Sequence, residues 1–316
     1  MKTKCFILLY MCSILAFSQD PHFSQIGIDR LHFNPSLIGN FNSDLDFRAS
    51  MQRRSQWESV SIPFSTFSMT YEYRKAYKDL NIGIQFLNDK SGTSLLTLNQ
   101  LNFGFSKVFQ LKNLSQLSIG SALGVSQKKF NYEDLLFIEN EPINSNKFIF
   151  TDIGLGASYT SNQNKKTNYI LGSSIFHLNR PNNSFIYKNS EVLPIRHNAY
   201  FRINYNYSSK FKINSEIMLN KQSSQKEVLV GLVPKIYISE TIVSSNIYYR
   251  LKDAMIFGFG LEKNNFEINL TYDVNISSLA QASENKGGFE FSIVYYWNKK
   301  LKTKNNKTKE PCPRFL

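Results

Sequence analysis

Residues 266–275 read FEINLTYDVN, an unbroken alternation of apolar and polar side chains. Successive side chains of a β-strand point to opposite faces, so this stretch predicts a strand with one apolar and one polar face. The same alternation recurs at 254–263, and at 287–297 it places five large apolar side chains on one face: Phe289, Phe291, Ile293, Tyr295 and Trp297. The pattern near the end of the chain therefore predicts consecutive strands, each with a single apolar face that must be kept from water.

Working outward, the region 44–297 divides into about fourteen segments of this kind, separated by clusters of Asn, Lys, Ser, Gly or Asp. Their expected bounds are 44–53, 64–75, 79–88, 96–110, 114–128, 148–161, 167–178, 196–208, 210–221, 226–238, 241–250, 254–263, 265–275 and 287–297. An even number of segments about ten residues long is typical of a bacterial outer-membrane barrel. We therefore predict an all-β protein, a transmembrane antiparallel β-barrel of about 14 strands.

Aromatic residues favour lipid over a protein core as the environment of the apolar face. They gather at the ends of the expected segments, at Tyr71, Tyr73, Tyr205, Tyr207, Tyr248, Tyr249 and 295–297. Outer-membrane barrels carry aromatic girdles at both lipid interfaces. The mean hydropathy of −0.31 is compatible with a polar lumen. A period of two alone also fits a soluble sandwich, which stays an alternative.

The first eighteen residues have the features of a secretory signal peptide. Lys2 and Lys4 precede an apolar stretch, and Ala16 and Ser18 are the small residues expected before a cut at Gln19. We expect four regions: a signal peptide (1–18), an N-terminal periplasmic segment (19–43), the barrel (44–297) and a basic C-terminal tail (298–316). Bulky neighbours of Cys12 argue against lipidation.

Composition narrows the function classes of the expected mature chain. Removing Lys2 and Lys4 leaves 35 of 37 basic residues against 24 acidic ones, an excess that suits anionic lipid or an acidic partner, and nucleic acid is a poor partner for an exported protein. Cys312 would be the single cysteine, which rules out an intramolecular disulfide. The scattered histidines form no metal or hydrolase motif, so we expect no enzyme activity and no cofactor, with an outer-membrane hydrolase as a minor alternative.

Five ordered motifs resemble the PorP/SprF family of the type IX secretion system of Bacteroidota. The chain opens with 19–25, QDPHFSQ, and continues with 33–39, FNPSLIG, both similar to family patterns. The stretch 48–66 then contains QRRSQW and PFST, which resemble the third motif. Residues 272–290, YDVNISSL followed by GGFE, and the closing CPRF at 312–315 complete the series. Ser36, Arg54 and the extra Leu316 depart from the family pattern.

The resemblance implies an outer-membrane component of type IX secretion or gliding motility. Such a protein assists the secretion or surface attachment of a large adhesin, or of other cargo with a type IX C-terminal signal, through contacts with periplasmic and envelope components. A passive porin for small solutes is the alternative, because both classes share a polar lumen. An even strand count would place both flanks of the barrel on the periplasmic side.

The family motifs also supply candidate partner-contact positions, which are Asn34, Pro35, Arg48, Gln56, Trp57, Pro63, Phe64, Cys312, Pro313, Arg314 and Phe315. Each has a structural interpretation beside the functional one. Pro35 would shape a turn and Trp57 would anchor at an interface. Arg48, Arg53 and Arg54 would be lumenal charges paired with acids such as Glu58, Glu72 or Asp273. Cys312 would be a free thiol, an intermolecular link or a structural residue.

Overall fold

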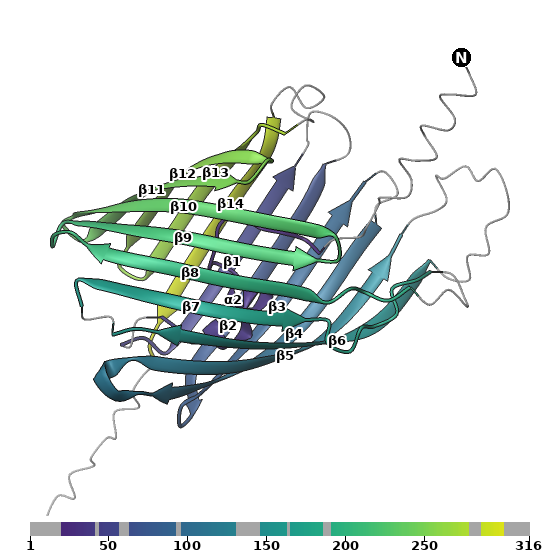
Figure 1. Cartoon of the computed structure of the whole chain (residues 1–316), viewed down its shortest axis with the longest axis horizontal. Helices are drawn as coiled ribbons and strands as arrows, with labels where there is room; N and C mark the ends of the chain where they lie inside the picture. Colours follow the sequence, from purple (N-terminus) through teal and green to yellow (C-terminus); the bar gives the residue numbers. More distant parts are fainter. Residues whose placement is uncertain are drawn as a thin grey trace, which may run out of the picture.

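The computed structural model describes residues 20–41, 44–56, 63–92, 96–130, 146–162, 165–185, 191–277 and 286–299. Fourteen strands form a closed barrel in which each strand pairs with its sequence neighbours and β1 pairs antiparallel with β14 (Figure 1). The predicted barrel and its strand number are confirmed. Among these residues no helix is long and apolar enough to cross a membrane.

The strands agree with the expected segments to within a few residues, and their bounds are as follows. They are β1 (Phe47–Gln56), β2 (Phe64–Tyr77), β3 (Leu80–Ser91), β4 (Leu96–Gln110), β5 (Gln116–Lys129), β6 (Lys147–Thr160), β7 (Thr167–Phe176), β8 (Arg196–Asn206), β9 (Phe211–Gln222), β10 (Gln225–Ile238), β11 (Thr241–Arg250), β12 (Ala254–Lys263), β13 (Phe266–Asn275) and β14 (Lys286–Trp297). The short helices are α2 (Arg30–Phe33), η2 (Pro35–Leu37) and η3 (Lys112–Leu114).

Alternation gives the wall an apolar outside and a polar inside. On β13, Phe266, Ile268 and Leu270 are exposed outward, whereas Thr271 and Asp273 are buried toward the lumen. Rings also stack at one rim, where Phe47 lies 4.5 Å from Tyr73 and 5.3 Å from Trp297 between ring centroids. The expected aromatic girdle is present there.

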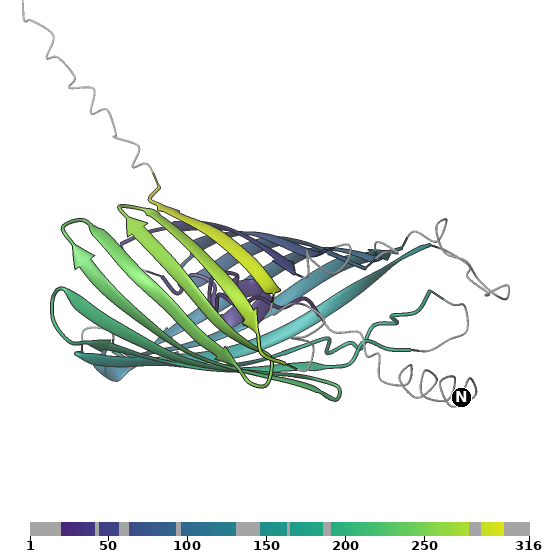
Figure 2. The ribbon, with the colours of Figure 1, turned by 90° about the horizontal axis from the view of Figure 1, so that it is seen from above.

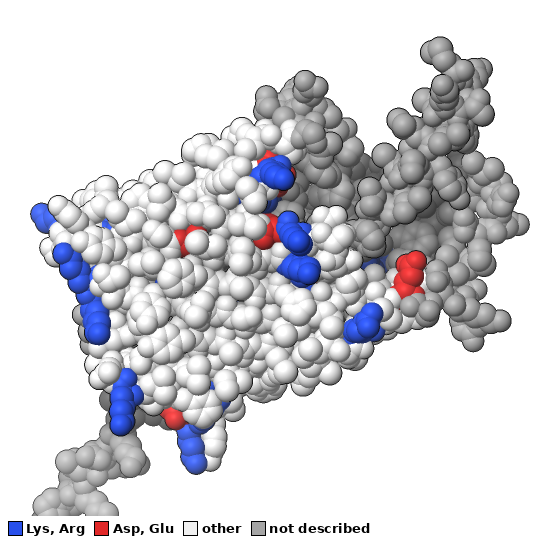
Figure 3. All heavy atoms as spheres, viewed as in Figure 1, with Lys and Arg blue, Asp and Glu red and all other residues white. Residues whose placement is uncertain are grey.

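The two rims differ in the length of their connections. Turns of two residues, such as 78–79, 239–240 and 264–265, lie at the rim where β1 begins and β14 ends; we call it the short-turn rim. The opposite rim carries the connections 130–146 and 177–195, and we call it the long-loop rim (Figures 1 and 2). In Figure 3 basic side chains line the left-hand edge, where short turns lie, and much of the outer wall is uncharged.

Residues 20–41 lie inside the barrel and form a plug; the purple helix that the strands enclose in Figure 2 is α2. This corrects the expectation of a periplasmic segment over 19–43 for its described part. The segment forms no strand or long helix, so its backbone groups need hydrogen-bond partners from elsewhere. The buried charged groups of the lumen also need partners, and the two sets satisfy each other. Ile26 packs against Tyr200, Met218, Leu229 and Ile256, whereas Leu31 and Ile38 pack against Ala122 and Phe176.

Candidate functional site

Ser24 and Gln25, near the start of the plug, bind an acidic site on β14. The backbone N–H groups of Ser24 and Gln25 donate to the two carboxylate oxygens of Glu290, at 2.8 and 2.9 Å. The Gln25 side chain also donates to the Glu290 backbone carbonyl at 3.1 Å and accepts from Ser292 Oγ at 2.5 Å. Ser24, Glu290 and Ser292 are completely buried. Charge-assisted hydrogen bonds to a buried carboxylate are strong and directional, so this contact fixes the register of the motif QDPHFSQ.

Two buried arginines complete that site. Arg54 Nη2 lies 2.6 Å from Asp273 Oδ2, and its Nη1 lies 3.1 Å from Glu290 Oε2. Arg250 Nη1 approaches the same Asp273 oxygen at 3.0 Å, and both arginines hydrogen-bond the Ser24 hydroxyl. Buried charges persist only when paired, and removal of one partner costs much more than the pair contributes. Arg54 is therefore a lumenal charge paired with one of the expected acids, Asp273.

A second ion pair holds the middle of the plug. Arg48 Nη1 lies 2.6 Å from Glu72 Oε1, and Arg48 Nη2 donates to the Ile28 carbonyl at 2.8 Å. The other Glu72 oxygen accepts from Gly39 N at 2.8 Å. Arg48 is therefore a lumenal charge paired with one of the expected acids, Glu72, and the pair also binds the plug. Arg53 corrects the prediction, because its position in the alternation of β1 directs it to the exposed outer face.

Asn34 and Pro35 form a tight turn against β6 and β7. The Asn34 amide donates to the carbonyls of Ala157 and Ser173 at 3.2 and 3.1 Å, and its oxygen accepts from Ser36 N at 2.9 Å. Pro35 begins η2, where its missing N–H costs nothing. A Cβ at Gly156 would collide with Asn34, so glycine on the wall permits this approach. The turn is enclosed by the wall, as the structural interpretation of these residues requires.

The first described residue is anchored at the long-loop rim. Asp20 Oδ2 lies 2.7 Å from His177 Nε2 and 3.0 Å from Arg196 Nη1, and His177 Nδ1 lies 3.0 Å from Asp152 Oδ1. Burial by itself lowers the pKa of His177, but the nearby carboxylates of Asp20 and Asp152 outweigh burial and raise this pKa to about 9. In turn, against the effect of burial, His177 and Arg196 hold the pKa of Asp20 well below its ordinary value. We call these four residues the rim latch.

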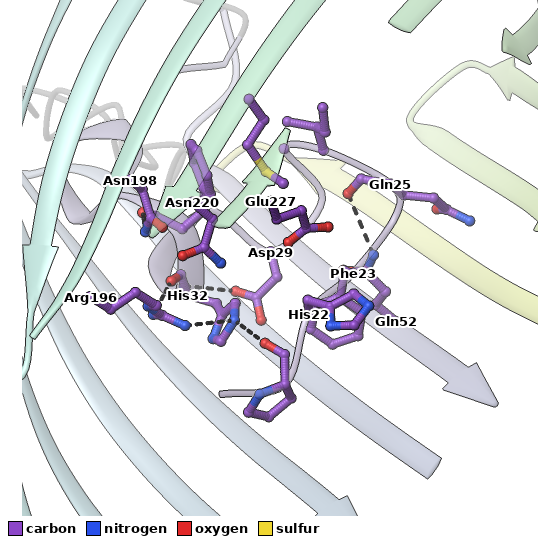
Figure 4. Close-up of a pocket in the computed structure, with 15 residues that line it drawn as sticks. His22, Phe23, Gln25, Asp29, His32, Gln52, Arg196, Asn198, Asn220 and Glu227 are labelled. Carbon is purple, nitrogen blue, oxygen red and sulfur yellow. Dashed lines mark hydrogen bonds between the residues drawn. The ribbon is translucent and has the colours of Figure 1, made fainter. Parts of the chain in front are cut away.

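Because Asp20 lies at the long-loop rim and Asn40 at the short-turn side, the plug spans the lumen. Asn40 donates to Thr160 at the end of β6, and Phe41 packs on Tyr296 near the end of β14. Beside the plug, Figure 4 shows a small cavity of about 40 Å³ near His22, Asn220 and Glu227. A water occupies at least about 10–15 Å³ of such volume, so this cavity suits a few waters and no larger ligand.

The other predicted positions lie apart from the plug. Gln56 ends β1, Pro63 is exposed, and Phe64 begins β2, all toward the long-loop rim. Trp57, Glu58 and 312–315 fall outside the described residues, and with them the candidates Cys312, Pro313, Arg314 and Phe315. Their partner-contact role stays a prediction. No group of three or more His, Cys, Asp or Glu in the described ranges could hold a metal ion.

Sequence reasoning missed most acidic anchors of the plug, namely Asp20, Asp29 and Glu290. Asp29 accepts hydrogen bonds from Ser68, Thr70 and Gln85 on β2 and β3. A signal for Glu290 was available, since it is a charged residue on the inward face of an alternating strand and follows two glycines in a family motif. Asp20 and Asp29 lie in an aperiodic segment, where spacing carries no such information.

The family model described as "Type IX secretion system membrane protein PorP/SprF" matches residues 15–295. No curated protein matches the sequence.

Among solved structures, the toluene transporter TbuX of Ralstonia pickettii is similar over 89% of this chain and 95% of its own, with a TM-score of 0.55 and 10% identity. The monoaromatic hydrocarbon channel CymD is similar over 88% and 94%, with a TM-score of 0.52 and 12% identity. A FadL homologue of Pseudomonas aeruginosa is similar over 84% and 92%, with a TM-score of 0.51 and 7% identity. At these identities the similarity concerns the outer-membrane barrel fold alone.

Proposed function

The chain belongs to the PorP/SprF family of type IX secretion system membrane proteins, and from this premise we propose that it is a non-enzymatic outer-membrane partner of the secretion and gliding machinery. In this role it assists the secretion or surface attachment of a large adhesin or other cargo with a type IX C-terminal signal. The protein acts by holding its partners and makes no covalent change in them.

The observation that carries this proposal is the plug. A passive channel needs a continuous aqueous path, whereas residues 20–41 cross this lumen. They are held by hydrogen bonds to Glu290, Glu72 and Arg48, which are themselves ion-paired in the wall, and by apolar packing on the opposite side. A closed barrel without free strand edges, filled by its own chain, is a rigid scaffold for loops and rims that bind other proteins.

The orientation follows from the rims. Short turns of outer-membrane barrels face the periplasm and longer loops face outward. We therefore infer that the short-turn rim faces the periplasm, and we expect the tail after Trp297 on the same side. An epitope inserted after Lys304 is expected to resist protease added to intact cells and to be cut once the outer membrane is opened. Cleavage in intact cells would reverse this orientation. An epitope in the connection 177–195 is the matched surface control.

The role itself is tested by a clean deletion in the native host, with surface and culture-medium proteomes compared among wild type, mutant and complemented strain. Selective loss of one or a few large proteins with type IX signals is expected. Loss of all such cargo would indicate a core component of the machinery, and an unchanged proteome would contradict the proposal.

The second candidate, a passive porin, is favoured by the channel-like solved structures of similar fold, such as the hydrocarbon channel CymD. It is opposed by the occupied lumen. Purified protein in planar bilayers is expected to show no large steady conductance under the conditions used for open porins. A large conductance of the wild-type protein, together with altered solute uptake in the deletion strain, would replace the secretion role with transport.

A further inference from the structure

Among the described residues, the plug leaves a large cavity on the side of the lumen formed by β8–β14. It measures about 460 Å³ and extends from Gln25 in the middle of the lumen to Asn265 and Asn298 at the short-turn rim. We call it the vestibule. Asn269 lies four residues beyond Asn265 along β13, a span of about 13 Å at roughly 3.3 Å per residue. Its volume is that of ordinary ligand sites, and its depth suits a chain of about three or four extended residues.

One cation in the vestibule lacks a full counter-charge. Arg30 and Arg48 share the Glu72 carboxylate, which lies 2.6 Å from Arg48 but 3.6 Å from Arg30. Arg30 Nη1 is buried and makes no hydrogen bond within the described structure. An additional anion at this place would supply the counter-charge that Glu72 gives mainly to Arg48.

The remaining groups of the vestibule select against a polyanion. Glu216 is paired with Arg202 at 2.8 Å, and Glu262 lies 3.8 Å from Lys235. Glu267, toward the mouth, accepts a hydrogen bond from Asn269 at 3.0 Å and another from Tyr296 at 3.4 Å. A single carboxylate that reached Arg30 would pass these acids, whereas a chain of uronic acids or phosphates would be repelled along its length.

Amide side chains are the other conspicuous feature. Those that line the vestibule are Asn214, Asn246, Asn264, Asn265, Asn269 and Asn298, together with Gln25, whose amide is already bonded to Glu290 and Ser292. Each amide both donates and accepts hydrogen bonds, which is what the alternating N–H and C=O groups of an extended backbone require. Tyr248 and Phe41 add aromatic surface, and Arg30 stacks over the Phe41 ring at 5.8 Å.

We propose that the vestibule binds the carboxyl-terminal end of an extended polypeptide that enters from the short-turn rim, with Arg30 as the ligand of the terminal carboxylate. The inference rests on the proposed function, because a secretion partner must hold a polypeptide. It assigns a site to that contact, on the rim opposite the long loops. The carboxylate would meet the part of the Arg30 guanidinium that lines the vestibule, because Nη1 itself is enclosed beside Glu72.

The test is a calorimetric titration of the full mature chain in a nonionic detergent. The two ligands are the tetrapeptide acetyl-Gly-Ser-Asn-Phe with a free terminal carboxylate and the same peptide as its C-terminal amide. The free acid is expected to bind at least tenfold more tightly than the amide, the usual scale of one charge-assisted hydrogen bond. Arg30→Gln is expected to lower affinity for the acid to that for the amide and to leave the amide unaffected. Arg30→Lys should retain part of the preference, and Arg53→Gln, an outward arginine of β1, should change nothing.

Equal binding of acid and amide, absence of binding, or an unchanged preference in Arg30→Gln would overturn the inference. Binding of trigalacturonate in place of the peptides would overturn it in favour of a carbohydrate. If Arg30→Gln fails to fold, as judged by heat-modifiable migration in gels, the comparison of acid and amide on wild type and Arg30→Lys still decides. A failed titration with selective cargo loss in the deletion strain rejects the vestibule alone, whereas peptide binding with an unchanged proteome rejects the secretion role.

Discussion

The two sides of the barrel hold the plug by different chemistry. On the side of β1–β3, β13 and β14, Glu72, Asp273 and Glu290 bind backbone N–H groups, a hydroxyl or arginines. On the side of β8–β12 the middle of the wall meets the plug through an apolar cluster that contains Ile26 and Leu229. The polar contacts to the plug on this side come from the ends of the strands nearest the long-loop rim, from Arg196, Asn198, Gln222 and Arg250. We call these the polar wall and the apolar wall. The vestibule also opens along the second side.

The two kinds of contact are therefore expected to have different roles, one in setting the position of the plug and the other in binding it more tightly. A carboxylate that accepts two consecutive N–H groups tolerates one position of the chain, whereas apolar packing tolerates small shifts. The polar wall is therefore expected to determine where the plug lies, and the apolar wall to add affinity. A polar network is also costly to break, because each lost member leaves buried partners unsatisfied.

The largest expected effect comes from breaking the polar wall at Glu290. In Glu290→Ala, Ser24 N and Gln25 N lose their acceptors and Arg54 keeps only Asp273, so removal of one buried partner should cost about 3–5 kcal/mol. The plug should detach, and steady conductance should appear in planar bilayers together with protease cleavage within 20–41. Glu240→Ala, in an exposed turn, is the control and should stay closed. A closed Glu290→Ala would show that the polar wall does not hold the plug.

A smaller effect is expected at the apolar wall. Ile26→Ala removes buried methyl groups beside Leu229 and Val233, at a cost of about 2 kcal/mol, the low end for such truncations since the vestibule lies adjacent. Hydrogen exchange of the plug amides should accelerate without steady conductance, because the ion pairs still set the register. Ile236→Ala, on the lipid-facing surface, should leave exchange unchanged. Conductance as large as that of Glu290→Ala would erase the distinction between the walls.

The polar wall also marks what could be predicted from the sequence. Alternation along a strand assigns each side chain to a face, so the barrel, its strand number and lumenal arginines paired with acids such as Glu72 and Asp273 could be anticipated. Which arginine meets which acid could not. The same rule, applied residue by residue, places Arg53 outside, since it lies between two inward residues of β1. The prediction for Arg53 was wrong because all three arginines of the motif were assigned to the lumen, although neighbouring residues of a strand point to opposite faces.

The plug itself could not be predicted in this way. Its segment has no period, and its partners are distant in sequence: Ser24 N and Glu290 are 266 residues apart. Nothing local in QDPHFSQ indicates that consecutive N–H groups meet a carboxylate on the last strand. The wall glycine at position 156 makes sense only once Asn34 is seen against it, because a missing side chain gives no sign of what fills its place.

The smallest expected effect lies where neither wall dominates, at the rim latch. The pKa of His177 is raised from 6.5 to about 9, so its charged form stabilises the plug fully below about pH 6.5, and this contribution is lost as the pH rises through about 9. Asp20, Asp152, Arg196 and His32 surround it, and Arg196 still pairs with Asp20 when the imidazole is neutral, so the loss should be about 1 kcal/mol. Exchange of the Asp20 to Phe23 amides should therefore accelerate between pH 7 and 9.5, beyond the intrinsic rate, in wild type and in the exposed control His197→Gln, but not in His177→Gln. The same pH dependence in all three proteins would mean that the latch does not depend on His177, and that the two walls alone hold the plug.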